Sequence, residues 1–528
     1  MSNRFTDILF QLIHSLEKAE KRNFKLYIKR SSANENLKIV ELFDALDKLQ
    51  EYDETLLLKK LSSIQKPQLA NVKVHLYKQL LASLRLLKST DSIDMQLNEQ
   101  LDFARILYNK GLYTQSLKIL EKLKETAKEH YKYNFLTQVV SWEKKIETLH
   151  ITRSMQHRGY SLAKEALEVN TRVSMVSRLS NLSLQLYSWY IENGHARNEE
   201  DEKVVAEFFH KNLPEHAETQ TGFYERLYLY QSYTWYAFIR QNFLVYYRYA
   251  KKWVDIFREN PLMMKVETGY YIKGMHTLMN AHFDLRNFEA FEIELDLFKE
   301  FAASPIGNKH DNHRIQTFIY IYNAWINQHF MKGTFSEGLE LVPALEEKME
   351  EYAMYLDNHR ILVFNYKIAN LNFGCGRYGV AIDYLQKIIN GSVELRNDLH
   401  CYARLLHLLC HYELGNFEII DSLIKSVYRF MARMKNLTIV EQMMFKFLRN
   451  SFHLSRGELR TELKELLAAI KQLEKNRFQT RSFAYLDIIS WLESKSTGLP
   501  LSEVIHAKYK KAKVRRYKKP KPKKKISA

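Results

Sequence analysis

Apolar residues recur along most of the chain at the three- and four-residue spacing of helices, and a repeated aromatic motif separates these helices in pairs. In the motif, an aromatic or leucine residue is followed three positions later by a small or polar residue, and two positions after that by a second aromatic or leucine. The motif has the size of an elbow between two antiparallel helices. Its instances are Tyr108, Gly111 and Tyr113; Phe238, Gln241 and Phe243; Phe283, Arg286 and Phe288; Phe330, Gly333 and Phe335; Phe373, Gly376 and Tyr378; Tyr412, Gly415 and Phe417; and Leu454, Gly457 and Leu459.

The central residues of these elbows recur at a nearly constant period. From Gln241 onward they lie 45, 47, 43, 39 and 42 positions apart, a period typical of stacked helical hairpins. The gap of 130 positions between Gly111 and Gln241 is about three periods and predicts two degenerate elbows. The candidates are Met155, Arg158 and Tyr160, and Tyr190, Asn193 and His195. We therefore expect an all-α fold, a right-handed α-solenoid of about nine helical hairpins over residues 95–475.

The segments on either side of the repeats have different patterns. Residues 1–90 lack the elbow motif but carry amphipathic spacing of their own, which predicts a mildly basic N-terminal helical cap. Residues 476–500 are expected to form a C-terminal capping helix. Residues 501–528 are rich in Lys and Arg, so we expect them to form a disordered basic tail.

Composition agrees with a helical, non-membrane protein. The 528 residues include 16 Gly and 8 Pro, well below average usage of roughly 7% and 5%. Pro343 lies inside the predicted second helix of the Gly333 hairpin, so that helix should kink or begin later.

No apolar run approaches the ~20 residues of a membrane span, and the start of the chain has no signal-peptide pattern. Three cysteines without a CxxC pair indicate a reducing compartment. We expect a cytoplasmic protein and leave a nuclear address open.

The net charge of +18 is concentrated at the ends of the chain. Residues 508–528 contain twelve Lys or Arg and no acid, and residues 1–90 contain 16 basic and 10 acidic residues, so residues 91–507 are neutral overall. The composition of the tail predicts a polyanionic partner, either nucleic acid or the ribosome. The alternatives are that the tail promotes solubility, that it is a nuclear address, or that it attaches the protein to an anionic membrane surface. The expected polyanion-binding residues are Lys508, Lys510, Lys511, Lys513, Arg515, Arg516, Lys518, Lys519, Lys523, Lys524 and Lys525.

The usual local signatures of enzymes do not occur in the sequence. It has no Gly-rich phosphate loop, HExxH, GxSxG or CxxC motif. His407, Cys410 and His411 come nearest to a metal cluster, but no acidic fourth ligand lies nearby. We expect no catalytic residues, no cofactor and no metal site.

The hairpin from Phe223 to Trp253 is unusually aromatic, with thirteen rings in thirty-one residues. One helix pair has too many ring positions to bury all of them, and basic residues are interspersed. The candidate aromatic and basic patch consists of Tyr228, Trp235, Arg240, Tyr247 and Arg248. The alternative is that Tyr serves here as amphipathic packing, with its hydroxyl at the rim.

The elbows resemble those of tetratricopeptide repeats, in which a glycine at the turn is followed by an aromatic two residues on and a small residue five residues on. The matching sets are Gly376, Tyr378 and Ala381; Gly333, Phe335 and Gly338; and Gly111, Tyr113 and Ser116. The small residue is replaced by a bulky one after Gln241, Arg286 and Gly415, and the repeats are longer than that family's usual unit. The resemblance covers residues 95–475 and implies a concave surface, built from the first helix of each hairpin, that holds peptides or partner proteins. The residues it would place on that surface are His276 and Asn280, Asn323 and Asn327, and Tyr366 and Asn370.

The sequence therefore predicts a non-enzymatic interaction scaffold. A helical-repeat groove would bind a protein or peptide, and the basic tail would tether the scaffold to nucleic acid or a ribonucleoprotein. The alternative is a nucleic-acid-binding regulator, in which the N-terminal helical unit contacts DNA or RNA and the solenoid acts as a sensor.

Overall fold

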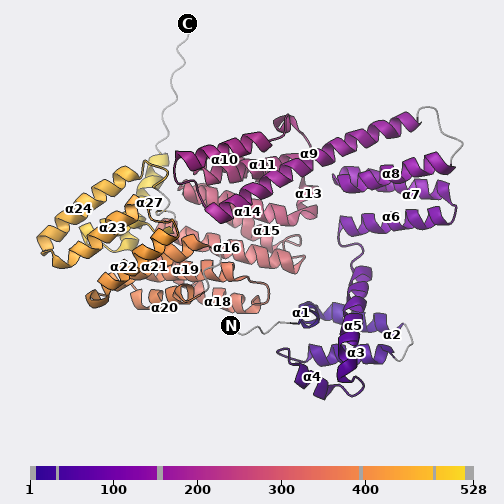
Figure 1. Ribbon diagram of the computed structural model, residues 1–528, viewed down its shortest axis with the longest axis horizontal. Helices are drawn as coiled ribbons and strands as arrows, with labels where there is room; N and C mark the ends of the chain where they lie inside the picture. The colour runs from indigo at the N-terminus through magenta and orange to yellow at the C-terminus, as the bar shows by residue number, and fades with distance from the viewer. Residues whose placement is uncertain are drawn as a thin grey trace, which may run out of the picture. The chain divides into compact units, whose positions relative to one another are not determined.

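The computed structural model describes residues 7–30, 35–150, 158–391, 396–479, 483 and 485–517. All regular secondary structure in these residues is helical (Figure 1). The chain forms two compact units, residues 1–170 and residues 171–528. The boundary lies inside the region that the sequence assigns to repeats, so the hairpin around Gly111 groups with the N-terminal helices.

The first unit has its own helical core. Its first five helices are α1 (Ile8–Ser15), α2 (Lys18–Lys29), α3 (Glu35–Asp47), α4 (Glu54–Lys60) and α5 (Lys66–Leu87). Phe10, Phe24, Phe43 and Leu76 are fully buried among them, as the amphipathic spacing predicts. Three longer helices follow: α6 (Ile93–Asn109), α7 (Tyr113–Glu129) and α8 (Tyr133–His150). The helix α9 (Arg158–Asn193) begins in this unit and continues into the second.

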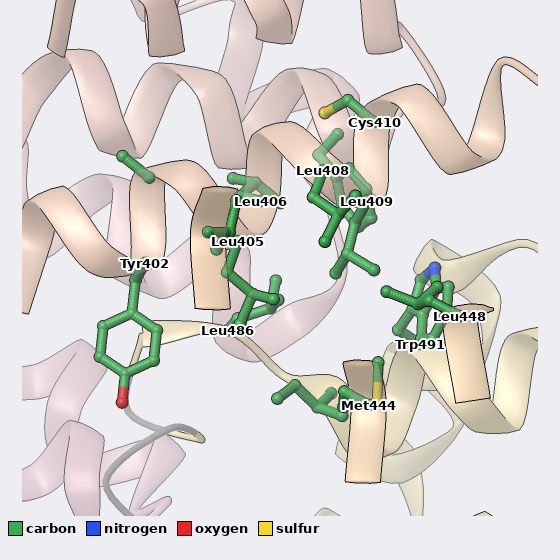
Figure 2. Close-up of a cluster of buried hydrophobic side chains, with 14 of the residues drawn as sticks. Tyr402, Leu405, Leu406, Leu408, Leu409, Cys410, Met444, Leu448, Leu486 and Trp491 are labelled. Atoms are coloured by element: carbon green, nitrogen blue, oxygen red, sulfur yellow. The ribbon is translucent and has the colours of Figure 1, made fainter. Parts of the chain in front are cut away.

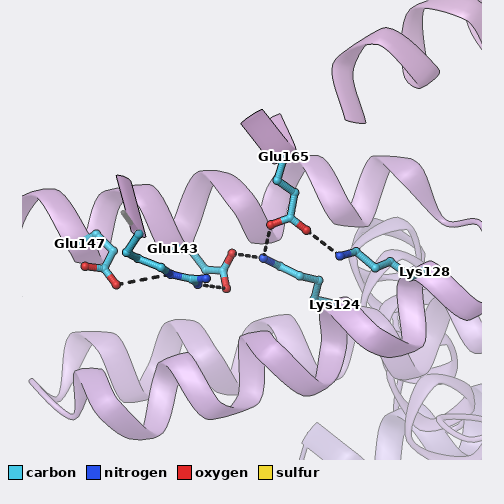
Figure 3. Close-up of polar contacts among 6 residues, drawn as sticks. Lys124, Lys128, Glu143, Glu147 and Glu165 are labelled. Carbon is cyan, nitrogen blue, oxygen red and sulfur yellow. Dashed lines mark hydrogen bonds and ion pairs between the residues drawn. The ribbon is translucent and has the colours of Figure 1, made fainter. Parts of the chain in front are cut away.

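A buried ion-pair network joins α7, α8 and the start of α9 (Figure 3). Lys124 bonds to Glu143, and its Nζ lies 2.7 Å from a carboxylate oxygen of Glu165. Lys128 lies 2.7 Å from the other oxygen of Glu165, and Arg158 lies 3.1 Å from Glu143. Burial opposes ionisation of Glu165, but hydrogen bonds from the two lysines outweigh it and lower the pKa of this carboxyl. Each buried charge is therefore compensated by an opposite one.

The second unit is a succession of packed helices. After α9 come α10 (Glu199–Asn212), α11 (Phe223–Ile239), α12 (Phe243–Glu259), α13 (Pro261–Val266), α14 (Thr268–Asp284), α15 (Phe288–Ala303), α16 (Asp311–Lys332), α17 (Phe335–Leu339), α18 (Val342–Glu351), α19 (Asn358–Gly374), α20 (Tyr378–Ile389), α21 (Asn397–Glu413), α22 (Phe417–Arg433), α23 (Ile439–Asn450) and α24 (Arg456–Leu473). The first helices α14, α16, α19 and α21 contact one another in that order, so successive hairpins stack (Figure 1).

Six of the seven predicted elbows are chain reversals with a left-handed residue at the centre. Gly111, Gly333, Gly376 and Gly415 have φ between 72° and 77°, and Gln241 and Arg286 have φ of 55° and 51°. The left-handed conformation ends the first helix and lets the second begin two residues later. The seventh prediction is wrong. Gly457 lies in the first turn of α24, whose N-cap Ser455 forms a capping box with Glu458.

The two degenerate elbows are also corrected by the structure. Met155 lies outside the described residues, and Arg158 begins the 36-residue helix α9, which continues through Tyr160, so no elbow is centred on Arg158. The second candidate is displaced by one residue, because the left-handed turn residue after α9 is Gly194, not Asn193. The count of nine hairpins stays a prediction.

Pro343 breaks the second helix of the Gly333 hairpin in the manner expected of proline. The short helix α17 ends at Leu339, and α18 restarts at Val342 with Pro343 in its first turn. There the missing N–H of proline leaves no intrahelical bond unmade. The helix is therefore split into two pieces.

The C-terminal segment packs against the repeats, which corrects the expectation of disorder from residue 501. It forms α26 (Ile488–Thr497) and α27 (Leu501–Tyr517). Val504 and Ile505 of α27 are buried, and the His506 ring nitrogen Nδ1 lies 3.0 Å from the carbonyl oxygen of Lys332. Residues 518–528 lie outside the described residues.

The segment before α27 completes the core around α21 (Figure 2). Leu486 and Trp491 lie among Leu405, Leu409 and other apolar side chains of α21 and α23. The indole nitrogen of Trp491 donates to Glu413 at 2.7 Å. The ring of Tyr485 stacks on that of Tyr402 with centroids 4.3 Å apart. Because these side chains fill the core of the last hairpins, the segment is part of the folded unit.

Candidate functional site

Three asparagines occupy the same register position in three consecutive hairpins. Asn280 on α14, Asn327 on α16 and Asn370 on α19 each lie six residues before a left-handed turn residue. All three line one cavity of about 310 Å³ in the second unit. The surface of α14, α16 and α19 that carries these amides is called the asparagine face below.

Each of these amides is already oriented by a neighbour. The Asn280 Nδ2 lies 3.1 Å from the His276 ring, Asn370 donates to the Tyr366 carbonyl at 2.8 Å, and the Asn327 side-chain oxygen accepts from Lys367. These contacts use only part of the hydrogen-bonding capacity of an amide, which has two donors and an acceptor oxygen. The remaining capacity is available to a ligand in the cavity.

The cavity combines polar groups with the rings of the elbows. Its walls include Phe238, Phe283, Phe330 and Phe373 from four successive elbows. Such mixed walls are typical of sites that bury an organic ligand and orient it with a few polar contacts.

The cavity wall also carries charged residues that the sequence analysis did not name, among them Lys367 and Asp284. Burial lowers the pKa of the Lys367 ammonium to about 7. Burial raises the pKa of the Asp284 carboxyl to about 7, and the nearby Arg286 opposes this shift. Neither residue forms an ion pair within the described part of the chain. The sequence pattern did not indicate that Lys367 and Asp284 belong to the site, because neither residue occupies the register position shared by the asparagines.

The protein's own C-terminal segment borders the same cavity. Leu486, Asp487, Leu501 and Ile505 are among its walls. The Tyr366 hydroxyl donates to the main-chain carbonyl of Tyr485 at 3.1 Å. A residue of the asparagine face thus already binds the backbone of a polypeptide segment that comes from elsewhere in the chain.

The other two residues that the resemblance places on this face have different surroundings. The His276 ring stacks on Tyr320 with centroids 4.1 Å apart. Asn323 is buried and donates to the Ile319 carbonyl of its own helix at 2.7 Å. Neither residue is part of the cavity wall.

Most of the candidate aromatic and basic patch is engaged in packing. The Tyr228 hydroxyl lies 2.9 Å from that of Tyr270, Trp235 packs on Tyr187 at 4.8 Å between ring centroids, and Tyr247 packs on His282 at 5.0 Å. Arg240 is paired with Glu202 at 2.5 Å, whereas Arg248 is exposed. The patch therefore does not form one continuous set of free side chains.

The basic residues of the predicted tail divide into three groups. Lys508 is 2.7 Å from Glu493 and 2.7 Å from the Ser490 hydroxyl, so it stabilises the packing of α27 on α26. Lys510 and Lys511 are exposed on α27. Lys513, Arg515 and Arg516 lie in α27 without described side chains, and the remaining predicted residues lie outside the described residues.

A basic face on α2 forms a shallow hollow in the first unit. Its walls include Lys18, Arg22 and Lys29, which are exposed, together with Lys21 and Lys25. Lys21 and Lys25 each lie 2.6 Å from an aspartate of α3, Asp47 and Asp44 respectively. The acids of α3 thus neutralise part of the basic helix.

No described helix is long and apolar enough to cross a membrane. No protein-family model matches the sequence. No curated protein matches it either.

Proposed function

We propose that this protein is a non-enzymatic interaction scaffold whose tetratricopeptide-like hairpins bind an extended peptide segment of a partner protein on the asparagine face. The observation that carries the proposal is the row of Asn280, Asn327 and Asn370 along one cavity, beside a tyrosine that already bonds to a main-chain carbonyl. Amide side chains can both donate hydrogen bonds to a peptide backbone and accept them from it. They can therefore hold an extended peptide in one direction with little dependence on the peptide's sequence.

The length of the expected ligand follows from helix packing. Neighbouring packed helices lie about 8–10 Å apart, so the row from α14 to α19 spans roughly 16–20 Å. An extended chain rises about 3.3 Å per residue, so five or six residues cover the row. This is the length of many peptide motifs and is short enough for the cavity to set their register.

The experiment starts from a displayed library of random 12-residue peptides selected on the full-length protein. An enriched peptide is labelled with fluorescein, and its Kd is measured by anisotropy. Replacing all three asparagines by alanine should weaken binding about a hundredfold, since each lost hydrogen-bonding group contributes about 1 kcal/mol. Asn181→Ala, at an exposed position on α9 of the same unit, is the control and should leave the Kd unchanged.

Two results would contradict the proposal. One is a selection in which no peptide is enriched over a blank surface. The other is a triple variant that keeps its thermal midpoint and binds the selected peptide as tightly as the wild type.

We further propose that the basic C-terminal segment tethers the scaffold to nucleic acid or a ribonucleoprotein. The support is the density of lysine and arginine after residue 508, with Lys510 and Lys511 exposed on α27. Removing residues 518–528 leaves α27 intact and should strongly weaken binding of a labelled 20-nucleotide single strand. Unchanged binding would contradict the tether.

The basic face of α2 supports a second candidate, a regulator that contacts nucleic acid through the first unit. Lys18, Arg22 and Lys29 are exposed on one side of this helix. Their combined change to glutamine distinguishes the two proposals. It should abolish strand binding if the first unit holds the nucleic acid, and should change it little if the tail does.

A further inference from the structure

The asparagine face continues toward the N-terminal ends of its helices as a cluster of cations. Lys273 on α14 and Arg360 on α19 both approach the ring of Tyr320 on α16, at 5.3 Å and 5.4 Å from its centroid. Both cations thus lie over the same aromatic ring. Three neighbouring hairpins thus contribute one residue each to a single cluster.

His276 links this cluster to the cavity. Its ring stacks on Tyr320 and contacts Asn280, which lines the cavity. Lys367, which also lines the cavity, bonds to the side-chain oxygen of Asn327 and lies near the carbonyl oxygen of Asn323, at 3.4 Å. The cations and the asparagine row therefore belong to one surface.

None of the three cations has an acidic partner. Lys273, Arg360 and Lys367 form no ion pair in the part of the chain that the structure describes, although ion pairs are common elsewhere in the second unit. Their contacts are to a phenol, an amide and a carbonyl oxygen, which are neutral groups. Burial lowers the pKa of Lys367 to about 7, and an anion bound beside the three residues would stabilise its charged form.

The directions in which the pKa values of Tyr320 and His276 shift agree with a positive potential around the cluster. Burial by itself would raise the pKa of the Tyr320 hydroxyl, yet the charges of Lys273 and Arg360 outweigh burial and lower it. Burial first, and then the charges of Lys273, Arg360 and Lys367, hold the pKa of His276 well below its usual value. His276 is therefore neutral near pH 7 and does not add to the positive charge.

We propose that Lys273, Arg360 and Lys367 bind the carboxylates of an acidic peptide segment laid along the asparagine face. This inference rests on the proposed peptide-binding function and specifies the ligand's chemistry. Arg360 and Lys367 are seven residues apart on α19, which places their backbones roughly 10 Å apart along the helix. In an extended peptide, aspartate or glutamate residues two positions apart project from the same side and lie about 7 Å apart, a difference that the long Arg and Lys side chains can span. The ligand is an acidic peptide, because the amide row beside the cations supplies partners for a peptide backbone.

The experiment compares peptide selection by three full-length proteins: the wild type, Lys273→Met/Arg360→Met, and the control Arg460→Met/Lys464→Met. The control removes the same two charges from exposed positions on α24 of the same unit. The wild type and the control should enrich peptides with two acidic residues, whereas the cluster variant should not. The Kd of a labelled wild-type-selected peptide should rise at least tenfold in the cluster variant, because a hydrogen bond to a charged group is worth about 1.5 kcal/mol or more.

Further variants and probes separate the remaining outcomes. Lys273→Arg/Arg360→Lys keeps the charges and should retain most of the binding, which excludes a general loss of fold. Peptides that are enriched without acidic residues, and that still depend on the asparagines, would overturn this inference and leave the proposed function standing. Failure to enrich any peptide would overturn both. Weaker binding of a labelled 20-nucleotide single strand to the cluster variant, with unchanged peptide binding, would assign the cations to nucleic acid and overturn the inference.

Discussion

Replacing Gly333 by alanine should release α27 from the hairpins. Gly333 is a left-handed elbow residue with φ of 72°, and α27 packs directly over it. A Cβ at this position would lie 2.5 Å from the Ser502 carbonyl oxygen and 2.9 Å from the His506 backbone nitrogen. Both are main-chain atoms of α27, so no side-chain rotation can relieve the overlap.

The expected magnitude combines local strain with loss of docking. An alanine in the left-handed region costs about 1–2 kcal/mol. Undocking exposes Val504 and Ile505, each worth about 1.5–3 kcal/mol when buried, and breaks the contact from His506 to the Lys332 carbonyl, worth about 1 kcal/mol. The docking contacts are therefore worth about 4–7 kcal/mol, enough to keep α27 folded onto the wild-type hairpins.

Gly376→Ala is the matched control. Gly376 has nearly the same φ, 73°, and a Cβ there would meet no atom within 4 Å. This variant should show the backbone strain alone. Because a chain with two units need not unfold in one step, the assay is hydrogen exchange read by mass spectrometry over residues 501–512, with tryptic cleavage after Lys510 and Lys511 as a second readout.

The reasoning predicts fast exchange and fast cleavage of α27 in Gly333→Ala, and protection close to that of the wild type in Gly376→Ala. Equal protection of α27 in the two variants would refute it. That result would mean that the close approach of α27 to the Gly333 elbow contributes nothing to its docking.

Three further predictions concern buried contacts. Lys124→Met should destabilise the first unit by about 3–5 kcal/mol, because Glu143 and Glu165 lose their shared cation, and exchange of α7 and α8 amides would report it. Because the pKa of Glu165 is lowered in the folded state, its stabilisation is complete above its ordinary value of 4.5 and is lost as the pH falls through the lowered value. Glu165 pairs with two lysines of α7, so wild-type protection of α7 should decrease in acid. Trp491→Ala should lower the stability of the second unit by about 3–5 kcal/mol, whereas Tyr428→Ala, 44% exposed, should change its denaturation midpoint little.

The elbows were predictable because their determinants are local. A ring, a turn residue and a second ring occupy six consecutive positions, and the backbone follows at Gly111, Gly376 and Gly415. Gly457 shows that the spacing of the motif alone is not enough to predict an elbow. The capping box of Ser455 and Glu458 beside it is a helix-start signal, and it would have placed Gly457 inside a helix.

The C-terminal helix was missed because its charge concealed its apolar face. Leu501, Val504 and Ile505 follow the helical spacing that predicts a buried side, and Pro500 precedes them as a helix-start signal. The asparagine row followed from the repeat register, since each member lies six residues before its turn. The three cations could not be predicted in the same way, because Lys273, Arg360 and Lys367 occupy different register positions. They come together only when the three hairpins stack.

The contact between His506 and Lys332 joins residues 174 positions apart. At a synthesis rate of about 5–20 residues per second, α16 emerges roughly 9–35 s before the helix that covers its end. During this interval the Gly333 elbow is uncovered on the nascent chain. The last hairpins therefore acquire this part of their packing only after α27 has been synthesised.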